Sequence, residues 1–225
     1  MPKRAFLFAA SITAIGASAC GSALALWSCE LPTAFLFCLA LAALGSMFKV
    51  ILPGLTGAIS PSVMPILFAA GKLSWQETVV IAALAGVIQC LWRARQTPTM
   101  LQILFNGASL AISGGVAQEV SHRVAESSSL MLFVVAAIVY QVVNTFSVAT
   151  ILSLLTDAPL RAMWRNIHLW SFPWSLASGG FAAVWAQANM PAGFSAAVIC
   201  AVTLYLMSAL YAEIAVRSNR TSQTA

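Results

Sequence analysis

Long stretches without a charged residue recur along almost the whole chain, and they restrict the fold more than any other feature. The longest of them runs from residue 169 to residue 212. A helix needs about 20 mostly apolar residues to cross a bilayer, so such stretches are typical of membrane spans. Only 8% of the residues are charged and 60% are hydrophobic, whereas soluble domains carry roughly 25% charged residues. The sequence therefore predicts an all-α fold, a polytopic helical bundle integral to the membrane.

Charges and turn signals divide the chain into eight predicted spans. The run 169–212 is too long for one helix and contains the turn signal Asn189–Gly193, so we divide it there. Ser74 and Glu77 have capping-box spacing before an apolar run, and Thr97-Pro98 predicts another helix start. The predicted spans are roughly 5–27, 31–48, 55–71, 75–93, 98–119, 129–156, 168–188 and 193–216.

The positions of Lys and Arg predict the orientation of these spans, because cytoplasmic loops are enriched in both residues. With the N-terminus inside, all but two of the 11 Lys and Arg residues fall on the cytoplasmic side. The two exceptions are Lys72 and Arg123. We therefore expect both termini in the cytoplasm, with residues 1–216 forming one membrane domain and residues 217–225 a short cytoplasmic tail.

The first span has the features of a secretory signal peptide as well. Pro2-Lys3-Arg4 precedes an apolar stretch, and Ala17-Ser18-Ala19 resembles a cleavage site before Cys20. The apolar run, however, continues past this tripeptide to Trp27. We therefore expect an uncleaved helix.

The stretch from Phe48 to Pro61 is the least helical part of the chain. It contains Pro53, Gly54 and Gly57, which together cannot continue a regular helix. One interpretation is a re-entrant or broken segment that lines a ligand cavity, since non-helical backbone at membrane depth must be surrounded by protein or water. The other is a cytoplasmic turn followed by a kinked helix. The sequence leaves both open.

Two predicted spans carry polar side chains at helical spacing. In each span these residues share one face, which must point into the bundle because a bare amide is costly in hydrocarbon. We expect Gln102, Asn106, Tyr140 and Asn144 to face one shared interior region, bonded directly or across a ligand. The candidate residues for binding a small uncharged ligand are Gln102, Asn106, Ser109, Tyr140, Gln141 and Asn144, together with Gly57 and Ser60 of the broken stretch.

The connection after Asp157 places four further residues at helical spacing. They are Arg161, Trp164, Arg165 and His168. An interfacial helix whose arginines meet anionic lipid headgroups explains this pattern. A docking surface for a cytoplasmic partner is the alternative.

Catalytic and metal motifs are missing from the sequence. The five cysteines form no C-x-x-C pair, and neither histidine lies in the middle of an apolar segment, as haem ligation inside the membrane would need. There is no P-loop, H-E-x-x-H or G-x-S-x-G. We therefore expect no catalytic residues, no metal and no cofactor. The net charge of +5 is explained by the cytoplasmic loops, so we expect no nucleic-acid partner.

A series of short motifs resembles a known family. Leu52-Pro53-Gly54, Trp92-Arg93, Phe105-Asn106, Tyr140 and Trp164 follow one another as in the N-terminal membrane regions of some bacterial cyclic-di-GMP signalling enzymes. In those enzymes the membrane sensor precedes a cytoplasmic diguanylate cyclase or metal-dependent phosphodiesterase. The resemblance implies a sensor module in the bacterial inner membrane. The residues after Arg217 are too few for such an output domain, so we expect action through a partner.

The leading interpretation is a non-enzymatic membrane protein that binds a small uncharged ligand and informs a cytoplasmic signalling partner. The first alternative is a small-solute transporter or the substrate-binding subunit of one. Its basis is that Pro173 and Gly179-Gly180 interrupt the seventh span as prolines and glycines interrupt the third. A purely structural membrane protein is the other alternative.

Overall fold

The computed structural model describes residues 1–48, 50–51, 58–92, 94, 97–125, 129–188 and 192–223. Within these residues the chain forms eight α-helices and one pair of two-residue strands. The all-α prediction is therefore confirmed except for that pair. The elements are α1 (Lys3–Ala25), α2 (Pro32–Met47), β1 (Val50–Ile51), β2 (Ala58–Ile59), α3 (Val63–Lys72), α4 (Trp75–Leu91), α5 (Met100–Val124), α6 (Ser129–Thr156), α7 (Leu160–Gln187) and α8 (Ala192–Gln223).

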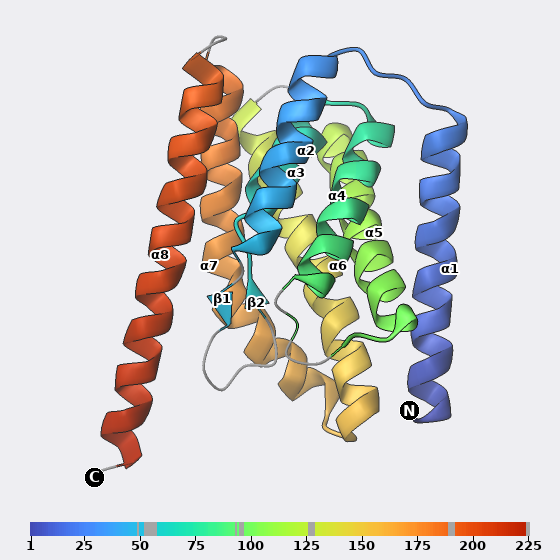
Figure 1. The fold of residues 1–225 in the computed structure, drawn as a ribbon, viewed down its shortest axis with the longest axis vertical. Helices are drawn as coiled ribbons and strands as arrows, with labels where there is room; N and C mark the ends of the chain where they lie inside the picture. Colours follow the sequence, from blue (N-terminus) through green and yellow to red (C-terminus); the bar gives the residue numbers. More distant parts are fainter. Residues whose placement is uncertain are drawn as a thin grey trace.

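The helices lie side by side in one bundle, with α1 at one edge and α8 at the other (Figure 1). Both ends of the chain lie at the same end of the bundle, which we call the terminal end. The opposite end, called the distal end, holds the last turns of α1, α3, α5 and α7. This alternation agrees with the order of directions predicted from the sequence.

Three of the described helices are long and apolar enough to cross a membrane. They are α1, α5 and, within α6, Leu130–Thr156. The apolar helices α2, α3 and α4 are shorter, as is the apolar part Gly193–Met207 of α8. Phe6, Leu7 and Leu24 on α1 are 52–64% exposed, and large apolar side chains on an outer helix face suit contact with lipid tails. The structure thus supports a helical membrane-type fold.

The third predicted span is shorter than expected. The sequence predicts this span at roughly 55–71, with its first residues in the least helical stretch, whereas α3 begins at Val63 and has 10 residues, or about 15 Å at 1.5 Å per residue. Before it, β1 and β2 pair in antiparallel register, with Val50 opposite Ile59. Pro61 precedes the helix and Pro65 lies in its first turn, where a backbone N–H has no helical partner. The described residues before α3 therefore form a pair of antiparallel strands, and Pro61 lies outside the helix.

Two other predicted helix starts were also displaced. The seventh span was predicted at 168–188, but α7 begins at Leu160 and continues through Pro173 and both glycines to Gln187. The fifth helix is capped by Thr99, not Thr97, because the Thr99 side chain and Gln102 form a reciprocal capping box. The capping box predicted at Ser74 is confirmed.

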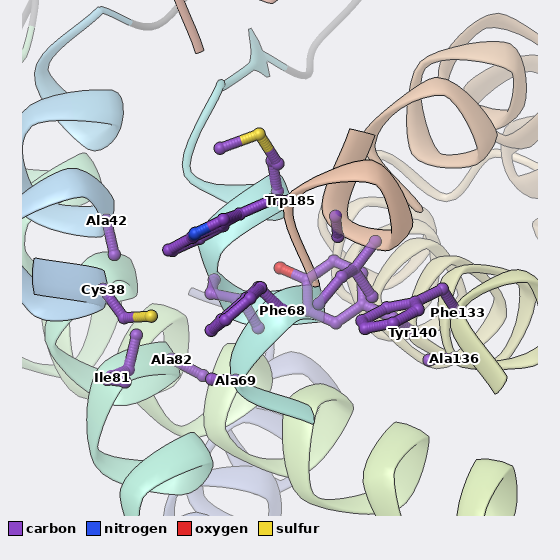
Figure 2. Close-up of a cluster of buried hydrophobic side chains, with 14 of the residues drawn as sticks. Cys38, Ala42, Phe68, Ala69, Ile81, Ala82, Phe133, Ala136, Tyr140 and Trp185 are labelled. Carbon is purple, nitrogen blue, oxygen red and sulfur yellow. The ribbon is translucent and has the colours of Figure 1, made fainter. Parts of the chain in front are cut away.

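Aromatic side chains from three helices fill the centre of the bundle (Figure 2). The ring of Phe68 on α3 stacks on that of Trp185 on α7, with centroids 3.5 Å apart and planes 16° from parallel. Phe133 and Tyr140 of α6 are fully buried beside them. The short α3 is therefore the central element of the core, and α2, α4, α6 and α7 surround it.

Small residues allow the helices to approach closely. A Cβ added at Gly16 of α1 would lie 2.5 Å from the Cα of Ala108 on α5, and one added at Gly179 of α7 would lie 2.9 Å from the Cβ of Ala137 on α6. A Cβ at Gly21 or at Gly180 would meet nothing within 4 Å. Helix packing therefore requires glycine at positions 16 and 179, whereas Gly21 and Gly180 have room for a larger side chain.

Candidate functional site

A buried carboxylate lies at the distal end, in the first turn of α4. Glu77 is 1% exposed. Its Oε2 accepts hydrogen bonds from the Ser74 backbone N–H at 2.8 Å and from the Ser74 hydroxyl at 2.9 Å. The Ser74 Oγ in turn accepts from the Glu77 N–H at 3.3 Å. This reciprocal pairing satisfies two backbone groups that a helix start leaves free, and it fixes the direction of the carboxylate.

The connection between α1 and α2 is tied to the same carboxylate. The Cys29 thiol donates to Glu77 Oε1 at 3.1 Å, and Gln76 Nε2 donates to the Leu26 carbonyl at 3.1 Å. The hydrogen bond to Glu77 raises the pKa of the Cys29 thiol, with burial as a smaller cause, because the carboxylate stabilises the protonated form. Cys29 is therefore a hydrogen-bond donor here rather than a reactive thiolate.

Helix α5 supplies two further polar groups at this end of the bundle. Gln118 Nε2 donates to the Leu73 carbonyl at 2.8 Å. His122 Nε2 lies 3.0 Å from the Ala70 carbonyl. Because a carbonyl oxygen only accepts, this hydrogen bond requires a proton on His122 Nε2. Both carbonyls belong to the last turn of α3 and its end, where helical partners are missing. The Gln118 Oε1 is buried and has no hydrogen-bond partner among the described residues.

A polar pocket of about 150 Å³ opens beside Glu77. Its charged lining residues are Glu30 from the α1–α2 connection, Lys72 from the last turn of α3, and Glu77 itself. Glu30 and Lys72 are exposed, whereas Glu77 is buried. Leu31, Leu73 and Ser74 complete the lining. The pocket therefore joins the α1–α2 connection to the α3–α4 junction, and we call it the distal pocket.

Within the described part of the chain, these opposite charges do not pair. The ion pair found there joins Arg123 to Glu119 on the surface of α5. Lys72 is not within 4.0 Å of Glu30 or Glu77, although all three line one pocket. The distal pocket thus keeps an ammonium group and two carboxylates apart.

A second polar region joins α6 to α7 nearer the terminal end. Gln141 Nε2 donates to the Ser171 hydroxyl, and Trp164 Nε1 donates to Thr145 Oγ1 at 3.1 Å. The centroid of the His168 ring lies 5.1 Å from the centroid of the Trp164 ring. These bonds are made within the helix pair, so this region functions as an interhelical contact.

The residues predicted to form a cytoplasmic surface divide into two pairs. Trp164 and His168 are half-buried against α6, whereas Arg161 and Arg165 are exposed. Only the arginines are therefore placed to meet lipid headgroups or a partner.

The predicted ligand-binding residues lie in several environments. On α5, Gln102 is exposed and serves the capping box, Asn106 is half-buried, and Ser109 is buried with its Oγ unpartnered. On α6, Tyr140 lies in the aromatic core, while Asn144 is half-buried and its Oδ1 has no partner among the described residues. No hydrogen bond between described residues joins these two faces, so a shared region for them stays a prediction.

The broken stretch contributes one described candidate. Ser60 is buried, and its hydroxyl donates to the Gly45 carbonyl of α2 at 2.8 Å. Its own carbonyl accepts a bond from Trp174 of α7 at 3.3 Å. Gly57, with the rest of 52–57, lies outside the described residues.

Sequence reasoning missed the distal pocket. The Ser74–Glu77 spacing indicates a helix start, and it does not indicate a pocket beside that start. The stronger signal was that Glu30 and Lys72 fall in two predicted connections on the same side of the membrane. Their proximity depends on the packing of α1 and α2 against α4, which the sequence pattern does not contain.

Comparison with known proteins gives one match. The family model MASE9 matches residues 33–178, a range that extends from α2 into α7 and includes Lys72, Ser74 and Glu77 of the distal pocket. No curated protein and no solved structure matches the chain.

Proposed function

Because the chain belongs to the MASE9 family, one of the MASE membrane-associated sensor domains of signalling proteins, we propose that it senses a small ligand at its distal end and informs a cytoplasmic signalling partner. MASE domains are non-catalytic, and the chain offers no catalytic motif. The observation that carries the proposal is the distal pocket, which lies at the end of the bundle opposite both chain ends.

The orientation follows from the positive-inside rule. Lys3, Arg4, Arg161 and Arg165 belong to helix starts at the terminal end, which we place in the cytoplasm of a bacterial cell. The distal pocket then faces outwards across the inner membrane. Lys49, Arg93 and Arg95 contribute to the same charge pattern from outside the described residues.

We propose eight crossings, of which the third is incomplete as a helix. α3 is too short to span about 30 Å of hydrocarbon, and the β1–β2 hairpin supplies the rest of that crossing within the bundle. Non-helical backbone at membrane depth is tolerated where protein or a water-filled cavity surrounds it. The Trp174 bond to Ser60 supports this arrangement.

The output we propose is a cyclic-di-GMP synthase or phosphodiesterase activity in the cytoplasm. This rests on the resemblance of the membrane region to those of cyclic-di-GMP signalling enzymes. Exposed Arg161 and Arg165 at the start of α7 form a surface for anionic headgroups or for this partner. The transporter alternative receives no support, because α7 is continuous where a second broken helix was expected.

Reporter fusions test the orientation. A reporter fused after Arg220 should be cytoplasmic, and one inserted in the Asn189–Gly193 turn should be external. The sensor function is tested by measuring cellular cyclic-di-GMP in the native host with wild-type protein and with Glu77→Gln. Equal levels in both strains under all growth media would argue against the proposal, as would an external C-terminal reporter.

A further inference from the structure

The distal pocket has the size and charge pattern for one class of ligand. We propose that it binds a small zwitterion, a free amino acid of the size of glycine or alanine, with the ammonium at Glu77 and Glu30 and the carboxylate at Lys72. This inference rests on the proposed sensor function and names what the sensor detects. Binding itself can be tested separately from signalling.

The Glu77 carboxylate has a hydrogen-bond acceptor position that no donor fills among the described residues. A carboxylate offers about four acceptor positions. Three are used, by the Ser74 N–H, the Ser74 hydroxyl and the Cys29 thiol. All three donors are neutral, although the carboxylate is 1% exposed. A buried carboxylate is costly without a cation, so one acceptor position and one negative charge are available to an ammonium group.

Lys72 is separated from both carboxylates of the distal pocket. Lys72 and the two glutamates line one pocket, and no ion pair within 4.0 Å joins them among the described residues. A ligand that carries both charges bridges this separation. A simple cation would pair with the carboxylates but be repelled by Lys72. A simple anion would pair with Lys72 but be repelled by the carboxylates.

The volume of the distal pocket limits the size of the ligand. The pocket volume is about 150 Å³, and glycine and alanine are small enough to occupy it. The few apolar lining groups, from Leu31 and Leu73, leave room for a hydrogen or a methyl group beside the charges.

The experiment is calorimetric titration of the full chain in mild detergent with glycine, L-alanine, methylammonium and acetate. We expect glycine and alanine to bind, and the two single-charge probes to bind at least about tenfold more weakly, because each loses one charge-assisted contact. Lys72→Gln and Glu77→Gln should each weaken glycine binding by a similar factor.

The variants are chosen to preserve the fold. Glutamine can replace glutamate in a capping box, so Glu77→Gln keeps the α4 start, and Lys72 is exposed. Glu119→Gln is the matched control, because it removes a distal-end charge on α5 outside the pocket, and it should bind glycine like the wild type. A gel-filtration profile for each variant confirms folding.

The outcomes separate the two proposals. Equal affinity for glycine and methylammonium, or the absence of any amino-acid binding at millimolar concentration, overturns the zwitterion site. If glycine binds as expected but cellular cyclic-di-GMP does not respond to it, the binding site stands and the proposed sensor function fails. If cyclic-di-GMP depends on this chain but glycine and alanine do not bind, the function stands and this inference fails.

Discussion

Replacing Gly16 by alanine should force α1 away from α5. The added Cβ would lie 2.3 Å from the Cβ and 2.5 Å from the Cα of Ala108, where ordinary contact begins at 3.4 Å. The two helices must therefore separate by about 1.1 Å locally, because neither the Cβ nor the backbone of an alanine can rotate aside. A gap of roughly 0.5–1 Å forfeits a quarter to a half of the dispersion energy of the neighbouring contacts.

The net cost can be estimated from two opposing effects. Overfilling a packed interface costs about 1–3 kcal/mol, and replacing a helical glycine by alanine returns up to about 1 kcal/mol. We expect Gly16→Ala to lower the free energy of unfolding by about 1–2 kcal/mol. Gly21 in the same helix meets nothing within 4 Å, so Gly21→Ala should raise it by about 0.5–1 kcal/mol.

Thermal unfolding in detergent, followed by intrinsic tryptophan fluorescence, is the assay. For chains of this length about 1 kcal/mol corresponds to roughly 2–4 °C in Tm. The two variants should therefore move Tm in opposite directions. If both raise Tm equally, α1 does not pack against Ala108 and the reasoning is refuted.

Three further experiments test other contacts. Gly179→Ala should lower Tm because its Cβ would lie 2.9 Å from another helix, whereas Gly180→Ala, with no neighbour within 4 Å, should raise it; the reverse order would contradict the α6–α7 packing. Ser74→Ala should cost about 1 kcal/mol in chemical denaturation by removing a cap, and an unchanged midpoint would contradict the capping box. Maleimide labelling of Cys29 should be slow at neutral pH and accelerate only above the usual thiol range, since the bond that the thiol donates to Glu77 raises its pKa; Glu77→Gln should shift that rise to lower pH, and identical profiles would exclude the bond.

Helix number, order and direction could be predicted from the sequence because they depend on local signals. Apolar runs, turn residues and the Ser74–Glu77 spacing each involve residues close in the chain. The sequence separates an interfacial helix around Arg161–His168 from the seventh span, because the charge-free run begins only at residue 169, whereas the structure joins the two in one helix. The helix in fact begins earlier, since Trp164 and His168 have partners on α6.

The candidate site could not be predicted in the same way. The distal pocket is assembled from Glu30, Lys72 and Glu77, which lie on separate elements, and only the packing of α1 and α2 against α4 brings them together. The polar faces around Asn106 and Asn144 were visible in the sequence because their spacing is helical. Spacing identifies a face, however, and not the element that it meets.

The bonds from α5 to the end of α3 also restrict how this bundle can move. Gln118 and His122 lie one turn apart on α5 and bind carbonyls of Leu73 and Ala70, which are likewise about one turn apart. A slide of one helix along the other by a full turn, about 5.4 Å, would break both bonds at once. A tilt or rotation of α3 and α5 together would preserve them. Movement at the distal end should therefore reach the terminal end as a change in helix inclination and not as a piston stroke.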